Sequence, residues 1–298
     1  MISRRKLIRA SAAGLIAAPC VLRAGRARAS GLTITITDDA SWSGAPPEMV
    51  NALAQVVSDL EAQITLPITI NVNVGWGECN TVPVTNPLIG QSSSNYTSAS
   101  YSSIVAGLTA NAITAEAHTA VSNLPGADPS SGAGFQITQA LYRALVAPGL
   151  APSRDGSIGF NSSALWFFGT PVAGRYDAYG EIMHEITEVM GRQFFDTAHW
   201  AVLNLFNYIS ANTLATLSQV GSFCYDKINL LHKFNNTGDG GDTFDWIPFN
   251  GAGGTNDSFN EINNTGVTNS YSAVDKTLMD VLGWSSPSAG QQTFGIVQ

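Results

Sequence analysis

The segment from Tyr176 to Arg192 contains the residues whose types and spacing could do chemistry. His184 and Glu188 are four positions apart, so on a helix they share one face and could bracket a single metal ion. Glu185 lies about 100° round the helix from His184, where it could take a proton from a metal-bound water. Imidazole nitrogen and carboxylate oxygen both bind zinc, so the pattern predicts a zinc site with Glu185 as its general base.

The same residues also permit a plainer interpretation. H-E-x-x-E alone has little information, because solvated glutamates at this spacing are common on surface helices. It differs from the better-known H-E-x-x-H by having Glu188 as the second ligand. A carboxylate ligand donates negative charge to the metal, so the sequence predicts a weaker Lewis acid than a three-histidine site, or selection of another metal.

Apolar periodicity predicts the elements that must position these side chains. Ile182, Met183 and Ile186 give a helix over about 176–190 a buried face, and Gly191 can end it. Upstream, residues 32–37 alternate as a strand, residues 46–64 show helical spacing, and residues 68–76 alternate again. Such a strand–helix–strand unit predicts a parallel pair of strands.

The remaining segments are assigned more coarsely. We expect loops and short helices that cover the sheet over 89–133, with a helical piece near 102–108, then a strand at 156–160, a helix over 201–217, a loop over 235–255 and a last helix over 272–282.

Several motifs in order resemble a known family. His184–Arg192 reads H-E-I-T-E-V-M-G-R, which is similar to the H-E-I-[ST]-E-V-M-G-R motif of a group of exported bacterial zinc metalloproteases related to the metzincins. Further similarities are V-G-W-G at 74–77, D-G-S-I-G-F at 155–160, G-D-T-F-D-W at 241–246 and the closing S-A-V-D to D-V-L-G-W at 272–284. Together they cover nearly the whole chain after its first thirty residues.

The resemblance implies an α+β fold of metzincin-like zincin type. Such a fold has a twisted mixed sheet, an active-site helix and a loop-rich, helical C-terminal part. Residues 30–298 would form a single catalytic domain, with an N-terminal part of about 30–191 and a C-terminal part of about 192–298.

The resemblance also implies an exported zinc-dependent metallopeptidase that acts on a protein or peptide substrate. His184 and Glu188 would bind Zn²⁺, and Glu185 would activate the water. The family's usual third-ligand position is occupied here by Phe194, which cannot bind zinc. Asp196, His199 and His232 are the open candidates for that ligand. The alternative is a non-catalytic, metzincin-like secreted binding or surface protein with a degenerate metal site.

A second metal is suggested by the loop around residues 239–245. Asp239, Asp242 and Asp245, with Asn235 and Asn236 nearby, supply the hard oxygens that Ca²⁺ prefers. Their spacing does not match an EF-hand. The loop is therefore either a turn or a calcium site. Arg192, by contrast, is expected to pair with an acidic group in a structural role.

The composition limits the classes of function. The chain of 298 residues is 44% hydrophobic and 12% charged, which excludes a disordered polymer. Seven of its 14 Lys and Arg residues lie within residues 1–29, and all 22 Asp and Glu residues lie beyond them. A chain this acidic after its first segment repels phosphate backbones, so we expect no nucleic-acid partner.

Residues 1–29 are typical of a twin-arginine signal peptide. Arg4 and Arg5 precede a weakly apolar stretch, and Ala27-Arg28-Ala29 resembles a cleavage site. The stretch is shorter than the roughly 20 apolar residues that span a bilayer, so we expect no membrane anchor after cleavage and a periplasmic or secreted protein. Cys79 and Cys224 would remain and could form a disulfide. Their pairing and the oligomeric state are left open.

Overall fold

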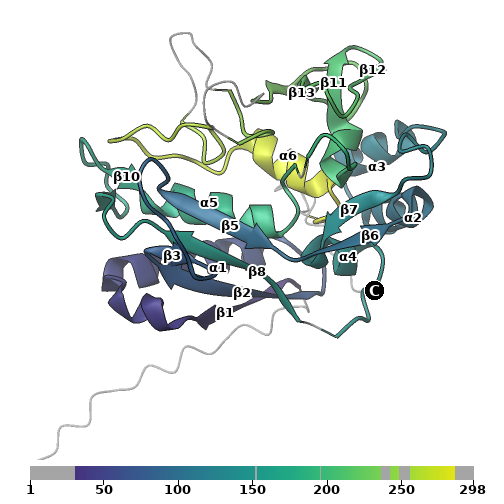
Figure 1. The fold of residues 1–298 in the computed structure, drawn as a ribbon. Helices are drawn as coiled ribbons and strands as arrows, with labels where there is room; N and C mark the ends of the chain where they lie inside the picture. Colours follow the sequence, from purple (N-terminus) through teal and green to yellow (C-terminus); the bar gives the residue numbers. More distant parts are fainter. Residues whose placement is uncertain (1–30, 152, 195, 236–241, 248–255, 286–298) are drawn as a thin grey trace, which may run out of the picture.

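The structure, a computed structural model, describes residues 31–151, 153–194, 196–235, 242–247 and 256–285. The predicted signal peptide and Asp239 lie outside the described residues. Within them the fold is α+β, with helices packed around several small sheets (Figure 1). The predicted α+β class is confirmed.

The elements have the following bounds. The main sheet contains β1 (Thr33–Asp38), β2 (Thr69–Trp76), β8 (Arg154–Phe160) and β5 (Gly90–Ser94). The α-helices are α1 (Pro47–Gln63), α2 (Tyr101–Asn111), α3 (Ala115–Ser122), α4 (Gln139–Leu145), α5 (Ala178–Val189) and α6 (Ala273–Val281). Two 3-10 helices are η1 (Ala40–Gly44) and η2 (Val202–Phe206). Smaller sheets pair β3 (Glu78–Cys79) with β4 (Val82–Pro83), β6 (Tyr96–Ala99) with β7 (Phe135–Thr138), and β9 (Trp166–Phe167) with β10 (Tyr176–Asp177). A further sheet joins β12 (Thr213–Leu214), β11 (Asn207–Ser210), β13 (Ser222–Phe223) and β14 (His232–Lys233).

The main sheet is mixed, and one of its edges is antiparallel. β1, β2 and β8 run parallel, and β5 pairs antiparallel with β8 at the edge. The predicted strand–helix–strand unit is confirmed as β1–α1–β2 with parallel pairing. Alternate residues of β2 are buried, which is the pattern of a strand whose two faces have different surroundings.

Helix α5 lies between this sheet and the C-terminal part of the chain. It packs on β5 and β8 and against α1, and its residues Gly180–Val189 are buried. Burial on all sides explains why its apolar stripe is accompanied by buried His and Glu side chains. The helix ends as predicted at Gly191, whose φ of 108° is in the left-handed region that favours glycine.

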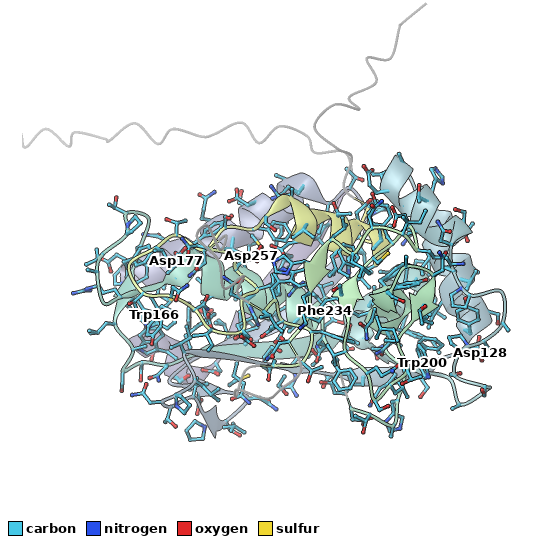
Figure 2. All side chains as sticks on the ribbon, turned by 90° about the horizontal axis from the view of Figure 1, so that it is seen from above. Asp128, Trp166, Asp177, Trp200, Phe234 and Asp257 are labelled. Atoms are coloured by element: carbon cyan, nitrogen blue, oxygen red, sulfur yellow. The ribbon has the colours of Figure 1, made fainter. Side chains whose placement is uncertain are left out.

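The C-terminal loops cross above α5 and close the core. Viewed from above, Phe234 and Asp257 lie across the middle of the molecule, between Trp166 at one end and Asp128 at the other (Figure 2). One hydrophobic core runs from Leu32 to Trp284, and the Trp284 Nε1–H donates a 2.9 Å hydrogen bond to the carbonyl of Met190, just after α5. The C-terminal segment is thereby tied to the end of α5.

Two sequence assignments were wrong. Residues 90–94 and 96–99, expected among loops and short helices, form the strands β5 and β6. The β5 sequence G-Q-S-S-S lacks apolar alternation because most of the strand is only half-buried. The helix expected over 201–217 is a short 3-10 helix followed by β11 and β12. Asn207 breaks the helical pattern there, because its side chain bonds the backbone of Gln219 and Gly221 instead.

Two further observations bear on membrane association and redox state. No helix among the described residues is long and apolar enough to cross a membrane. Cys79 and Cys224 are both buried free thiols, so the disulfide that the sequence left open is absent between them.

Candidate metal centre

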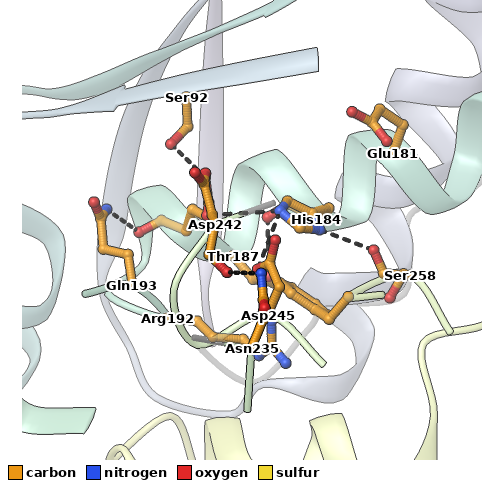
Figure 3. Close-up of polar contacts among 12 residues, drawn as sticks. Ser92, Glu181, His184, Thr187, Arg192, Gln193, Asn235, Asp242, Asp245 and Ser258 are labelled. Atoms are coloured by element: carbon orange, nitrogen blue, oxygen red, sulfur yellow. Dashed lines mark hydrogen bonds and ion pairs between the residues drawn. The ribbon is translucent and has the colours of Figure 1, made fainter. Parts of the chain in front are cut away.

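His184 is held with one ring nitrogen facing a group of carboxylates (Figure 3). Its Nδ1 lies 2.9 Å from the Ser258 carbonyl oxygen, which can only accept, so Nδ1 carries a proton and Nε2 is the nitrogen that faces the carboxylates. Nε2 lies 3.6 Å from Oε1 of Glu188 and 3.7 Å from Oδ1 of Asp245. The ring also stacks on Phe259, with centroids 4.6 Å apart.

Glu188 is one helical turn along α5, as the sequence predicted. Its Oε2 accepts a 2.7 Å hydrogen bond from the Ser92 hydroxyl on β5, which leaves Oε1 facing His184. Gln193 donates from Nε2 to the backbone carbonyl of Glu188 and to the Ser94 hydroxyl. The last turn of α5 and the edge strand are therefore fastened together at this point.

Asp245 offers a third possible ligand atom from a loop that Asn235 holds. The buried Asn235 donates from its backbone N–H to the Asp245 carbonyl at 2.7 Å, and from Nδ2 to the Asp242 carbonyl at 3.2 Å. Among the described residues, His184, Glu188 and Asp245 form the one group of three His, Cys, Asp or Glu side chains whose ligand atoms all lie within 4.8 Å of one another.

Two of the three ligand-atom separations are close to those around a metal ion of zinc size. Tetrahedral zinc with bonds of about 2.0–2.1 Å places its ligand atoms about 3.3 Å apart. The two distances from His184 Nε2, 3.6 and 3.7 Å, need little adjustment to reach that value. The three residues are each more than nine-tenths buried. One nitrogen and two carboxylate oxygens also suit harder divalent ions such as Mn²⁺.

The three third-ligand candidates from the sequence are not brought to this point. His199 pairs with Asp196 through its own Nδ1 at 2.8 Å, and both side chains are about half exposed. His232 stacks on Trp246, with ring centroids 4.5 Å apart. Phe194 lines the cleft beside the site without a ligand atom. The sequence did single out Asp245, but for calcium; the signal that could have found its role here is the G-D-x-x-D-W element.

Only part of the predicted calcium site lies within the described residues. Asp239 and Asn236 lie outside the described residues. Asp242 lines the cleft, and Asp245 belongs with His184 and Glu188. The two aspartates therefore face the candidate metal centre.

Glu185 borders an open cleft of about 410 Å³ next to the three ligand candidates. The cleft is lined by residues of β5, of α5, and of the loops before β5, after α5 and around residue 242, namely Leu88, Gly90, Gln91, Ser92, Glu185, Glu188, Gln193, Phe194, Asp242 and Thr243. Glu185 is 4% exposed, and its Oε2 has no hydrogen-bond partner within the described part of the chain. Its carboxyl is within hydrogen-bonding reach of Glu181. A buried carboxyl with an unused oxygen is one that a proton, a water or a cation would satisfy.

The electrostatics of the cluster favour a bound cation. Burial and the neighbouring Glu188 raise the pKa of Glu185 well above its usual value. Burial likewise raises the pKa of Asp245 to about 8, although His184 opposes this. Burial alone would lower the pKa of His184, but Asp245 and Glu188 raise it well above its usual value. Protons thus accumulate where carboxylates are crowded, and a divalent ion would replace them.

Comparisons of this chain with protein-family models, with curated proteins and with solved structures found no significant match.

Proposed function

We propose that this chain is an exported zinc-dependent metallopeptidase with a metzincin-like zincin fold. His184, Glu188 and Asp245 would hold Zn²⁺, and Glu185 would act as general base. The observation that carries the proposal is the convergence of three ligand atoms, each from a buried side chain, beside an open cleft that Glu185 borders. The twin-arginine pattern at 1–29 supports export to the periplasm or beyond.

The roles of the side chains follow from their contacts. Zinc, when bound, would lower the pKa of a water toward neutrality and polarise the substrate carbonyl. Glu185 would take the proton of the attacking water and later deliver it to the leaving amine, a task that a raised pKa suits. The Ser258 carbonyl accepts a hydrogen bond from Nδ1 of His184, so that Nε2 faces the metal position. The Ser92 hydroxyl binds Oε2 of Glu188, so that only Oε1 is left to bind the metal.

The edge strand supports a peptide substrate over a small molecule. β5 is the last strand of the main sheet, and its residues Gly90, Gln91 and Ser92 line the cleft. The outer edge of such a strand offers backbone N–H and C=O groups to an extended peptide. A peptide aligned there would run past Glu185.

The alternative is a binding or surface protein that has lost its metal. Its main support was the absence of a third ligand at Phe194. Asp245 weakens that support, because its carboxylate oxygen lies within 4.8 Å of the ligand atoms of His184 and Glu188.

The test uses the chain from residue 30 onward, loaded with zinc and incubated with an unfolded protein and a peptide library. We expect cleavage that a chelator abolishes and zinc restores. The E185Q variant should keep one zinc and lose about 10²- to 10⁴-fold in kcat/KM, the range of general-base catalysis. E48Q, a matched change on the exposed face of α1, should cleave normally. A wild-type protein that neither binds zinc nor cleaves any substrate would favour the binding protein, and an E185Q variant with full activity would exclude Glu185 as the base.

A further inference from the structure

Beneath the candidate metal centre, the buried Arg192 lies against two aromatic rings. Its Cζ atom is 3.1 Å from the ring centroid of Phe259 and 4.6 Å from that of Trp246. The residue is 2% exposed. Arg192 follows the glycine that ends α5, so these contacts join the end of the helix to two separate C-terminal loops.

Each ring is the chain neighbour of a residue that builds the metal centre. Phe259 follows Ser258, whose carbonyl fixes the His184 tautomer, and the Phe259 ring itself stacks on His184. Trp246 follows Asp245, the third ligand candidate. A displacement of the guanidinium would therefore shift both His184 and Asp245.

Asp275 holds this arrangement from behind. Its Oδ1 is 3.4 Å from Arg192 Nη2 and accepts a 2.7 Å hydrogen bond from Trp246 Nε1. Its Oδ2 is used in the capping box of α6 with Ser272. The carboxylate thus anchors the arginine and the tryptophan to the start of a helix.

The cost of burying Arg192 argues for a role beyond stability. Its Nε and Nη1 atoms have no hydrogen-bond partner among the described residues, so the guanidinium is only partly satisfied. Burial lowers its pKa, against the pull of Asp275 and Asp245. A well-packed apolar side chain of similar volume would stabilise such a site at least as well.

We propose that Arg192 is a positioning residue that sets the separation of Asp245 and His184, and through it the metal affinity. The inference rests on the metal centre of the proposed function, but not on peptidase activity. The planar guanidinium can lie against both rings while it pairs with Asp275, which a lysine ammonium cannot do.

The experiment measures the zinc dissociation constant by competition with a chromophoric chelator for wild type, R192M, R192K and R143M. Arg143 is the matched control, because it is equally buried and ion-paired, with Asp155 at 2.6 Å, but lies against the main sheet. We expect zinc binding to weaken about 10- to 100-fold in R192M, the cost of changes around a metal's ligands, with R192K in between. R143M should lose thermal stability and keep wild-type affinity. Circular dichroism identifies which variants are folded, and only these are compared. If R192M does not fold, R192K tests the same contacts with a milder change.

The outcomes separate this inference from the proposed function. Wild-type zinc affinity in folded R192M or R192K, or an equal loss in R143M, would overturn the role of Arg192. A wild-type protein that binds zinc but hydrolyses no peptide would overturn the proposed peptidase activity. The role of Arg192 would still be decided by the zinc affinities of the variants. A wild type that binds no zinc would overturn both.

Discussion

The Oδ1 atom of Asp245 lies 3.7 Å from Nε2 of His184, although one residue belongs to a loop and the other to α5. Asp245 thus adds a third side chain to the pair that α5 supplies, His184 and Glu188. His184 and Glu188 share a face of α5 by their spacing alone, whereas Asp245 reaches them because Asn235 and Trp246 hold its loop in place. The candidate metal centre is therefore assembled by tertiary structure.

The first prediction concerns Asp245 as the third ligand. D245A should weaken zinc binding by more than about 100-fold, beyond the usual cost of changes outside the ligand shell, because it removes a ligand atom. H199A and H232A should bind zinc like the wild type. Isothermal titration with each variant measures this. If H199A or H232A loses the metal and D245A keeps it, a histidine rather than Asp245 is the third ligand.

The part of the site that is local in sequence could be predicted. His184, Glu185 and Glu188 lie within five positions of one helix, and helical geometry fixes their relative directions. Asp245 was singled out only as a calcium candidate and as part of the G-D-T-F-D-W motif, because no periodicity states which distant element a loop will contact. The positions of Asp196 and His199 just after α5 favoured them, yet they bond to each other at the surface.

The same contrast holds for the fold. β1, α1 and β2 carry clear apolar periods and were predicted with their parallel pairing. β5 was missed because an edge strand beside a cleft needs few apolar side chains, and its residues are polar for that reason. Residues 201–208 are continuously buried, so their apolar run indicated burial without indicating a helix.

The second prediction concerns Gly90, whose backbone lies against two carboxyls. A Cβ at this position would collide with Oε1 of both Glu181 and Glu185. Both atoms are at the ends of flexible side chains, so G90A should fold with only a small change in stability. The added methyl group should displace the carboxyl of Glu185, the proposed base. We expect kcat/KM to fall on the order of 10- to 100-fold, as misplacement of a catalytic group does, with zinc affinity close to wild type.

The control for this change is G126A. Nothing lies within 4 Å of a Cβ built at Gly126, so this variant should behave as wild type in stability and activity. An active G90A enzyme with normal kinetics would show that the carboxyls move aside without consequence, and a G90A protein that fails to fold would show that β5 cannot shift.

The third prediction concerns the two buried thiols. Burial, with Glu185 adding to it, raises the pKa of Cys79 to about 12. Burial and the hydrogen bond to Asp226 raise the pKa of Cys224 to about 11. Because the thiolate is the reactive form, a folded chain from residue 30 should react very slowly with a thiol reagent at pH 8. Denaturant without reductant should expose two thiols; exposure of none would reveal a disulfide.

The fourth prediction concerns Asp226 and acid stability. Burial acts to raise its pKa, but the backbone N–H groups of Asn229 and Ile228 donate to its Oδ1 at 2.8 and 2.9 Å and lower the pKa to about 2. The charged carboxylate is thus more stable in the folded chain than in the unfolded one, where its pKa is about 3.9. Its contribution is present above about pH 4 and is lost as the pH falls toward 2.

The measurement compares chemical denaturation of wild type, D226N and E48Q at pH 5, 4, 3 and 2. Asparagine keeps an oxygen acceptor but carries no charge, so D226N should be less stable than wild type at pH 5 by about 1 kcal/mol, a value reduced for solvent screening. The difference should shrink as the pH falls, because the wild-type side chain becomes neutral as well. E48Q, on an exposed face of α1, should follow the wild type. A D226N deficit that stays constant from pH 5 to pH 2 would mean that packing or hydrogen-bond geometry, not the carboxylate charge, stabilises the turn before β14.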